Sequence, residues 1–455
     1  MEKTIAAIST APAPGGIGIV RISGGEAFAV AEKVFRGVSG KKVSQMKGYT
    51  AQLGGAYTPT GEKLDDVVAL VYRGPKSYTG EDVVELSCHG GLYMTKRLLQ
   101  LVLDAGAAPA GPGEFTRRAF LNGKMDLAQA EAVMGLISAS GEQARKAALA
   151  GSTGVLSRKI ESIKQGLLEQ AAHLAAWADF PEEDVPQVEE AALLEGIRQG
   201  EKALEELLQG FDRGRMYREG LVTVIAGRPN AGKSTLMNLL SGCQRSIVTQ
   251  YAGTTRDVVE ETVMVAGVPL RLADTAGIRD TDDPVESIGV QAARQRLETA
   301  QLVLAVFDSS QALEKEDWEL MDALENVPAI AIVNKSDLPT RMDVEAIQKR
   351  FEKTVSLSAA TGEGLAELEQ ALSEILDTKD FHPQEGVLFT QRQRMDAQTA
   401  LDSLREGEQA LVLGLTLDAV TVCVEDALHA LAALTGEQVS EEIVDRVFEE
   451  FCVGK

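Results

Sequence analysis

A glycine loop between an apolar run and a helix-like segment carries the residue types that bind phosphate. The loop follows the run 221–226 and reads Gly227-Arg228-Pro229-Asn230-Ala231-Gly232-Lys233-Ser234. Backbone N–H groups of such a loop point at phosphate oxygens, Lys233 supplies a cation for the β and γ phosphates, and the Ser234 hydroxyl can bind Mg²⁺. The spacing predicts a nucleoside triphosphate site here, with Ala231, Gly232 and Thr235 among its contacts.

A second set of residues suits the magnesium shell and the γ-phosphate of this site. Asp274 ends the strand-like run 268–273, which places a carboxylate at a strand end, where the Mg²⁺ shell needs one. Gly277 lets the backbone turn close to a γ-phosphate. The segment 253–257 contains Thr254 and Thr255, and we expect the Thr255 hydroxyl to be linked to Mg²⁺.

The base is selected by a third set of residues. Asn334-Lys335-Ser336-Asp337 ends the apolar run 329–333. The Asp337 carboxylate can accept both the N1–H and the N2–H₂ donors of guanine, whereas adenine offers neither, so GTP is favoured over ATP. Ser358 and Ala359 follow the strand-like run 354–357 and complete the predicted base pocket. All these motifs follow predicted strands, as expected for a doubly wound fold, in which ligands bind at strand ends.

The residues available for hydrolysis differ from a common arrangement. Many GTPases carry a water-orienting glutamine directly after the Asp-x-x-Gly turn, but this chain has Ile278 there, and an aliphatic side chain cannot position water. The amide oxygen of Asn230 and carbonyls of the segment 253–257 are suited instead to hold a monovalent cation. Glu286 is a candidate for orienting water, although a surface carboxylate is the commoner fate of a glutamate.

The composition of the chain limits which partners and which cellular compartment we expect. At 455 residues the chain is long enough for about three domains. Its net charge is −23, which disfavours broad nucleic-acid binding, so an RNA partner would need a local basic patch or another protein's surface. No signal peptide or membrane span is visible, and four scattered cysteines give no metal spacing or disulfide framework, so we expect a cytoplasmic protein.

Proline use outlines the architecture. No proline occurs between Pro112 and Pro181 or after Pro383, and both stretches are rich in helix-forming residues. Apolar residues at helical spacing within them are expected to form core: Leu127, Ala130, Val133, Met134, Ile137, Ala397, Leu401, Leu404, Leu411 and Leu415.

Three domains are predicted from these patterns. Residues 119–218 and 378–455 form the two parts of a helical domain, and residues 219–377 form a P-loop domain inserted between them. Residues 1–118 contain short β-branched runs such as 17–22 and 67–71, which indicate an N-terminal α+β domain. The fold class is therefore α/β and α multidomain, with a Ras-like P-loop domain inserted into the helical part.

Several motifs resemble those of one family, the tRNA modification GTPase MnmE, also called TrmE. They include the asparagine in the phosphate loop, the Gly-Thr-Thr-Arg-Asp of residues 253–257 and the C-terminal Phe451-Cys452-Val453-Gly454-Lys455. In the N-terminal part the resemblance covers residues 13–24, 77–86, 89–91, 112–116 and 119–127. It extends along essentially the whole chain, with Val453 a mild departure from the usual isoleucine.

The resemblance implies a potassium-dependent GTPase that works with the flavoprotein MnmG as a homodimer in a heterotetramer. The pair modifies C5 of the wobble uridine of certain tRNAs with an aminomethyl or carboxymethylaminomethyl group. The one-carbon unit comes from a tetrahydrofolate derivative, 5,10-methylene- or 5-formyltetrahydrofolate. It also implies that Asn230 binds K⁺, that Ser234 and Thr255 serve Mg²⁺, and that Glu286 activates water.

The folate contacts implied by the resemblance are Arg21, Glu85, Lys124 and the terminal Lys455. Cys452 lies beside a tail that we expect to be flexible, and the resemblance suggests a functional thiol there, with a spectator cysteine the open alternative. A rival interpretation is a regulatory GTPase switch in ribosome assembly without modification chemistry. It shares every nucleotide motif, but it has no need of a folate pocket.

Overall fold

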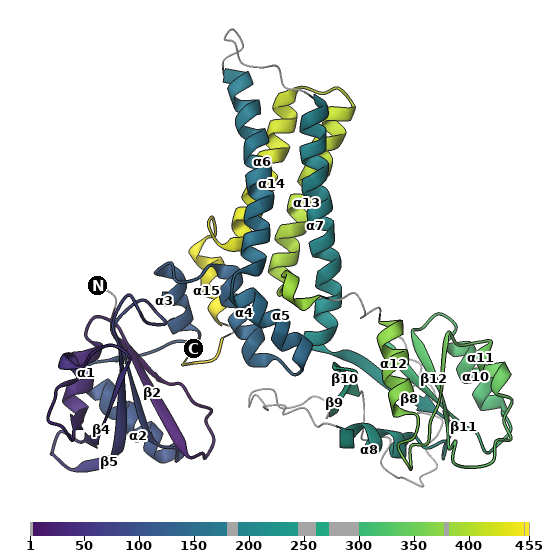
Figure 1. Ribbon diagram of the computed structural model, residues 1–455, viewed down its shortest axis with the longest axis horizontal. Coiled ribbons are helices and arrows are strands. Elements are labelled where there is room, and N and C mark those ends of the chain that lie inside the picture. The colour runs from purple at the N-terminus through teal and green to yellow at the C-terminus, as the bar shows by residue number, and fades with distance from the viewer. Residues whose placement is uncertain are drawn as a thin grey trace. The chain divides into compact units, whose positions relative to one another are not determined.

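The computed structural model describes residues 3–179, 190–243, 261–272, 300–376, 382–449 and 451–454, and Figure 1 shows its helices and strands. It contains two compact units, Met1–Met134 with Leu428–Lys455, and Gly135–Ala427. Among the described helices, none combines the length and the apolar character that a membrane crossing requires. The predicted fold class is confirmed, whereas the exact boundaries of the three domains stay a prediction.

The first unit is built on a seven-stranded sheet with the strand order β3-β4-β5-β6-β2-β1-β7. Neighbouring strands are antiparallel except for β1 and β7, which are parallel. The predicted run 17–22 lies within β2, and the run 67–71 lies within β5. The strands are β1 (Ile5–Ile8), β2 (Ile17–Ser23), β3 (Phe35–Gly37), β4 (Thr50–Tyr57), β5 (Lys63–Tyr72), β6 (Val83–His89) and β7 (Ala108–Pro109).

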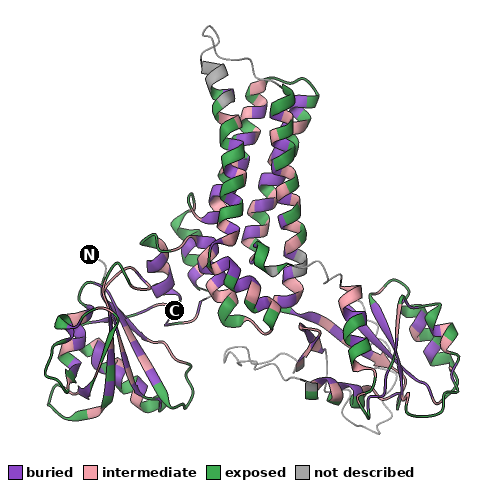
Figure 2. Ribbon diagram, in the orientation of Figure 1, coloured by how far each residue is buried: buried purple, intermediate pink, exposed green. Residues whose placement is uncertain are grey.

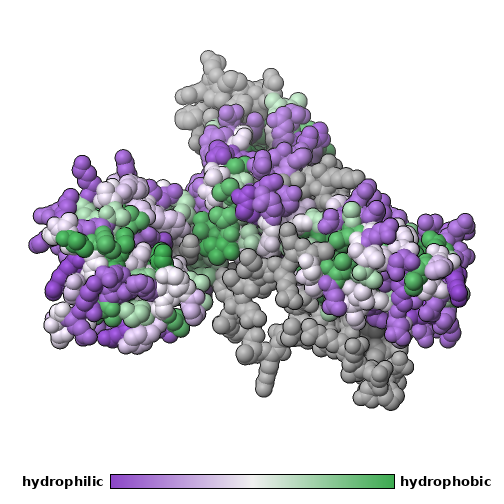
Figure 3. Space-filling model, turned by 60° about the horizontal axis from the view of Figure 1, so that its bottom comes forward, coloured by the Kyte–Doolittle hydropathy of each residue, from purple (hydrophilic) through white to green (hydrophobic). Residues whose placement is uncertain are grey.

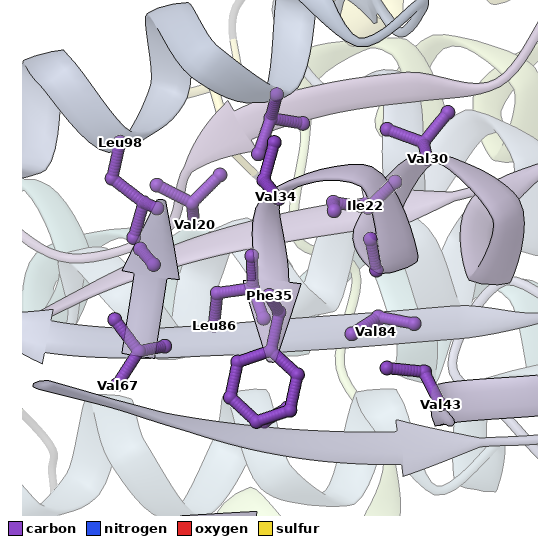
Figure 4. Close-up of a cluster of buried hydrophobic side chains, with 14 of the residues drawn as sticks. Val20, Ile22, Val30, Val34, Phe35, Val43, Val67, Val84, Leu86 and Leu98 are labelled. Carbon is purple, nitrogen blue, oxygen red and sulfur yellow. The ribbon is translucent and has the colours of Figure 1, made fainter. Parts of the chain in front are cut away.

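One face of this sheet packs against the helices α1 (Ala27–Val34) and α2 (Leu92–Asp104). Side chains alternate along a strand, so Val20 and Ile22 of β2 and Leu86 of β6 share the face that meets these helices. Figure 4 shows these side chains converging with residues of α1 and α2. All three are fully buried, which fixes the register of the sheet.

The other face of the sheet is only partly covered. At the β1 end, Phe115 of α3 (Glu114–Leu121) is fully buried beside Ile5 and Ala7. Nearer the opposite edge, Leu53 of β4 and Val68 of β5 leave 57% and 38% of their surface exposed. Apolar side chains therefore remain uncovered on the face that carries Arg21 and Glu85. Figure 3 shows apolar patches among polar residues on the side of this unit turned to the viewer.

The C-terminal residues complete the first unit. Phe448 of α15 (Glu441–Glu449) and Phe451 pack with Leu127 and Ala130, which begin α4 (Leu127–Ser138). The predicted core positions Leu127 and Ala130 are thus confirmed, whereas Ile137, near the end of α4, is 37% exposed. The buried face of α4 therefore ends before Ile137, earlier than the spacing of the apolar residues predicts.

Long helices form one part of the second unit: α5 (Glu142–Ser152), α6 (Val155–Asp179), α7 (Glu190–Glu219), α13 (Gln391–Val412) and the first part of α14 (Leu417–Thr435), whose end belongs to the first unit. Helices α7 and α13 flank the P-loop segment in sequence and pack together, with Leu404 contacting Gly200. Leu404 is fully buried, as predicted, whereas Leu415 is 54% exposed because α13 ends at Val412 and Leu415 lies in the turn that follows.

A six-stranded sheet forms the other part, with the order β13-β12-β11-β8-β10-β9. Its strands are parallel except for β9, which is antiparallel to β10. Strands β11 and β12 are buried along their whole length, visible as continuous purple in Figure 2. The strands are β8 (Leu221–Gly227), β9 (Glu261–Val265), β10 (Val268–Leu272), β11 (Leu302–Asp308), β12 (Ala329–Asn334) and β13 (Lys353–Ser356).

Helices of this sheet domain are α8 (Lys233–Cys243), α10 (Lys315–Ala323), α11 (Val344–Gln348) and α12 (Leu365–Ile375). Parallel strands with both faces covered match the predicted doubly wound domain, and each predicted strand, 221–226, 268–273, 329–333 and 354–357, coincides with an observed one to within two residues. Four of the sequence motifs therefore follow the carboxyl ends of strands of one sheet.

Candidate functional site

The glycine loop lies between β8 and α8. Gly232 has a φ of +98°, a backbone conformation that residues with a side chain rarely adopt. A Cβ at this position would collide with the side-chain amide nitrogen of Asn334. Glycine is therefore required twice over, by conformation and by space, and the loop can approach a ligand with its bare backbone.

The Lys233 side chain is hydrogen-bonded to the backbone of this loop. Its Nζ donates hydrogen bonds to the carbonyl oxygens of Gly227 and Arg228, both at 2.8 Å. Burial lowers the pKa of the Lys233 ammonium group. In the described part of the chain it has no carboxylate partner within 4.0 Å, so a half-buried cation faces only carbonyl dipoles. An anion such as a polyphosphate supplies the charge that this position lacks.

Asn334 joins the phosphate loop to the base loop. Its side-chain Nδ2 donates to the carbonyl oxygen of Ala231 at 2.8 Å, and its Oδ1 accepts from the backbone N–H of Ala359 at 3.0 Å. The side chain is buried, with 2% of its surface exposed. Three residues that the sequence assigned to separate motifs are therefore held by one amide group, and Asn334 acts by positioning both loops.

The base loop presents a carboxylate that is held from one side. Asp337 Oδ1 accepts a hydrogen bond from the Ser358 hydroxyl at 2.7 Å. Asp337 is exposed, while Ser358 is fully buried. Among the described residues no group donates to the second oxygen of Asp337, which leaves this oxygen available to the N–H donors of a guanine ring.

Lys335 is fixed by a partner that sequence reasoning missed. Its Nζ lies 2.6 Å from Oδ2 of Asp308, which ends β11 and is only 3% exposed. Burial alone would raise the pKa of Asp308, but hydrogen bonds from Lys335 and Ser310 hold it below the ordinary value of 3.8. The signal in the sequence was an aspartate that ends the apolar run 302–307, the same pattern as at Asn334.

The remaining nucleotide residues are only partly described. Asn230 has a φ of +63° and is exposed, and Ser234 and Thr235 are exposed in the first turn of α8. The other predicted contacts lie outside the described residues: Thr254, Thr255, Asp274, Gly277 and Glu286. Their assignments to Mg²⁺, to phosphate and to water stay predictions.

A second group of predicted residues meets in the first unit. Arg21 of β2 and Glu85 of β6 are direct partners in the antiparallel register, and their side chains form an ion pair at 2.9 Å. The Arg21 guanidinium lies over the rings of Tyr78 and Phe115, at 5.8 and 5.6 Å from the ring centres. The two side chains are 18% and 14% exposed, so this pair is sheltered rather than freely solvated.

Lys124 and the C-terminal tail belong to the same unit. Lys124 Nζ donates to the carbonyl oxygen of Pro75 at 3.0 Å. The backbone N–H of Gly113 donates to the carbonyl oxygen of Cys452 at 3.3 Å. Gly113 lies two residues before Phe115, whose ring contacts Arg21. The expected flexible tail is therefore wrong for residues 451–454, which are anchored, while Lys455 lies outside the described residues.

Two family models together match nearly the whole chain. The model described as "GTP-binding protein TrmE N-terminus" matches residues 4–124, and the model described as "MnmE helical domain" matches residues 127–452. Proteins named tRNA modification GTPase MnmE are similar over their full length. That of Alkaliphilus oremlandii is 43% identical and that of Symbiobacterium thermophilum is 44% identical, in both cases over 100% of this chain and 100% of the relative.

Solved structures match parts of the chain. The G domain of the FeoB iron transporter of T. maritima is 27% identical over 34% of this chain and 98% of that one, with a TM-score of 0.26. Era of Aquifex aeolicus is 27% identical over 42% of this chain and 67% of that one, with a TM-score of 0.27. Scores this low carry no weight for the fold.

Proposed function

The chain belongs to the MnmE family of tRNA modification GTPases, and on this premise we propose that it modifies C5 of the wobble uridine of certain tRNAs. It hydrolyses GTP, as the family name states. It works with the flavoprotein MnmG and adds an aminomethyl or carboxymethylaminomethyl group. The one-carbon unit is carried by 5,10-methylene- or 5-formyltetrahydrofolate.

The observation that carries the folate part of this proposal is the sheltered Arg21–Glu85 pair. The carboxylate of Glu85 suits the N–H donors of a pterin ring, while Arg21 and Lys124 suit the carboxylates of a glutamyl tail. The ring of Phe115 beneath Arg21 adds an apolar wall. A regulatory GTPase has no use for such a group, so the pair favours modification chemistry over the rival switch.

The predicted nucleotide-binding residues are suited to bind GTP. Among the described residues Lys233 has no carboxylate partner within 4.0 Å, and Gly232 lets the loop approach a ligand with its bare backbone, so both fit a polyphosphate. Ser234, Thr255 and Asp274 would hold Mg²⁺, which would supply positive charge to the β and γ phosphates. Asn230 would hold K⁺, which would supply the positive charge that an arginine provides in other systems. Glu286 orients the attacking water.

The uncovered sheet face supports a homodimer. Leu53 and Val68 lie on that face with about half of their surface in water, and the ion pair of Arg21 and Glu85 lies on the same side. A second copy covers these side chains and shelters the folate. With K⁺ and GTP bound, two P-loop domains would associate and then separate on hydrolysis, and the helices would transmit the change to the modification centre.

Mass spectrometry of wobble nucleosides from cells with and without this protein tests the proposal. Loss of the modified uridine in cells that lack the protein is expected, with recovery on return of the wild type. Arg21→Gln should fail to restore it, while the purified variant keeps GTP hydrolysis and loses affinity for 5-formyltetrahydrofolate. Arg97→Gln is the control, because Arg97 is exposed and belongs to the same unit. Unchanged nucleosides without the protein would overturn the proposal in favour of a regulatory switch.

A further inference from the structure

A strongly basic segment stands out in an acidic chain. The chain carries a net charge of −23, yet residues 33–61 contain five lysines and arginines and no aspartate or glutamate. These residues run from the end of α1 through the edge strand β3 and the loop 38–49 into β4. The charge is therefore concentrated at one edge of the first unit's sheet.

The cations of this segment are accessible to solvent. Arg36, Lys41, Lys42 and Lys47 are all exposed, although the Arg36 guanidinium also lies over the ring of Tyr57, 4.6 Å from its centre. Within the described chain none of them has a carboxylate partner within 4.0 Å, in contrast to Arg117, which is paired with Asp445 in the same unit. Unpaired exposed lysines keep their full charge for an external anion, so we call these four residues the edge cations.

The loop that carries the edge cations is held in place. Arg73 donates hydrogen bonds to the backbone carbonyl of Met46 at 3.1 and 3.0 Å, and its guanidinium lies 4.8 Å from the centre of the Phe28 ring. Val43 and Met46 are buried beneath the loop, with 1% and 4% of their surface exposed. The backbone is thus ordered before any partner binds, which lowers the entropy cost of binding.

We infer that the edge cations bind the phosphate backbone of the tRNA substrate. The inference rests on the proposed function and names the surface of this chain that the tRNA uses. Lysine and arginine side chains bind phosphate oxygens, and tRNA is the polyanion that the proposed function requires. An anionic membrane would attract the same cations, so it is one of the outcomes that the test separates.

The test compares two full-length variants with equal charge. Lys41→Gln/Lys42→Gln/Lys47→Gln removes three edge cations, and Lys159→Gln/Lys202→Gln/Lys349→Gln removes three exposed lysines of the second unit. Binding to a full-length tRNA with uridine at the wobble position is measured over a range of salt concentrations. Each lost phosphate contact lowers the slope of log affinity against log salt by about 1, so the first variant should lose roughly 2–3 and the control almost nothing.

Thermal unfolding and GTP hydrolysis should match the wild type in both variants, since the substituted side chains are exposed and none of them is among the predicted nucleotide contacts.

Four results would overturn the inference. If the wild type binds and modifies tRNA but the edge variant has the same affinity and slope, the surface is wrong while the proposed function stands. Equal losses in both lysine variants would show a general charge effect. Unchanged tRNA binding with new self-association, or with lost binding to vesicles of anionic lipid, would assign the lysines to edge protection or to a membrane. A wild type that ignores tRNA altogether would sink the proposed function as well.

Discussion

The Ser9 hydroxyl donates a hydrogen bond to the carbonyl oxygen of Gly454 at 3.1 Å, although the two residues are 445 positions apart in the chain. Together with the backbone bridge between Pro112 and Val453, this bond attaches the end of the chain to the N-terminal sheet unit. Cys452 is thereby fixed in the unit that also contains Arg21 and Glu85. A thiol anchored in this unit is consistent with the proposed function.

Gly454→Ala should detach this tail. Gly454 has a φ of +98°, and a Cβ there would collide with the carbonyl oxygen of Ile8. We expect loss of wobble modification with unchanged GTP hydrolysis, measured by mass spectrometry and phosphate release. Gly61→Ala is the matched control, because Gly61 has a φ of +87° and open space around the added Cβ. Equal effects of both substitutions would mean that backbone strain, not the tail contact, is responsible.

Asp337→Asn should change the choice of base. The amide can accept from only one of the two guanine donors, so GTP affinity should fall about a hundredfold or more, while xanthosine triphosphate gains. Calorimetry with both nucleotides measures the exchange. Ser358→Ala serves as the comparison, since it removes the 2.7 Å bond to Asp337 but keeps the carboxylate, and should weaken GTP without altering base preference. Unchanged GTP affinity in Asp337→Asn would refute the base pocket.

Asn334→Ala should weaken both nucleotide binding and folding. The substitution leaves the Ala359 N–H and the Ala231 carbonyl without their partner in a buried place, at a cost of about 1–3 kcal/mol for an unsatisfied group. Urea unfolding and GDP affinity measure the two effects. A variant that binds GDP like the wild type would show that the bridge between the two loops is unimportant.

Potassium dependence is tested at Asn230. Hydrolysis should be faster in K⁺ than in Na⁺, and Asn230→Gly should remove the difference. Glycine tolerates the φ of +63° at this position, so the substitution deletes the amide without adding backbone strain. Equally fast hydrolysis of the wild type in the two salts would count against the cation site.

The pH response of His89 is a further expectation. A hydrogen bond with Asp65, 2.7 Å from His89 Nδ1, raises the pKa of this histidine above 6.5. The protonated form is favoured in the folded state, so its contribution to stability is complete below pH 6.5 and is lost as the pH rises through the folded-state pKa. Asp65→Asn should move the His89 titration, followed by NMR, back toward 6.5. An unmoved titration would refute the pairing.

By itself, the sequence determined the strands, the phosphate loop and the base-selecting motif. Each of these features depends on a local pattern, in which an apolar run of strand length ends at a polar residue. The length and spacing of the run are enough to locate the strand and the residue that follows it. The run 329–333 predicted both β12 and the position of Asn334 at its end. The positive φ of Gly454 and its long-range hydrogen bond with Ser9 could not be predicted from these local patterns.

Only the tertiary structure decided which separated residues meet. Asp308 reaches Lys335 because β11 and β12 are parallel neighbours, and Ser9 meets Gly454 because the chain end packs on the N-terminal sheet. The failure at Leu415 has the same origin, since helical spacing continues past a turn that Gly414, with a φ of +68°, imposes on the backbone. Periodicity describes single elements, whereas contacts between distant elements depend on how their buried faces pack.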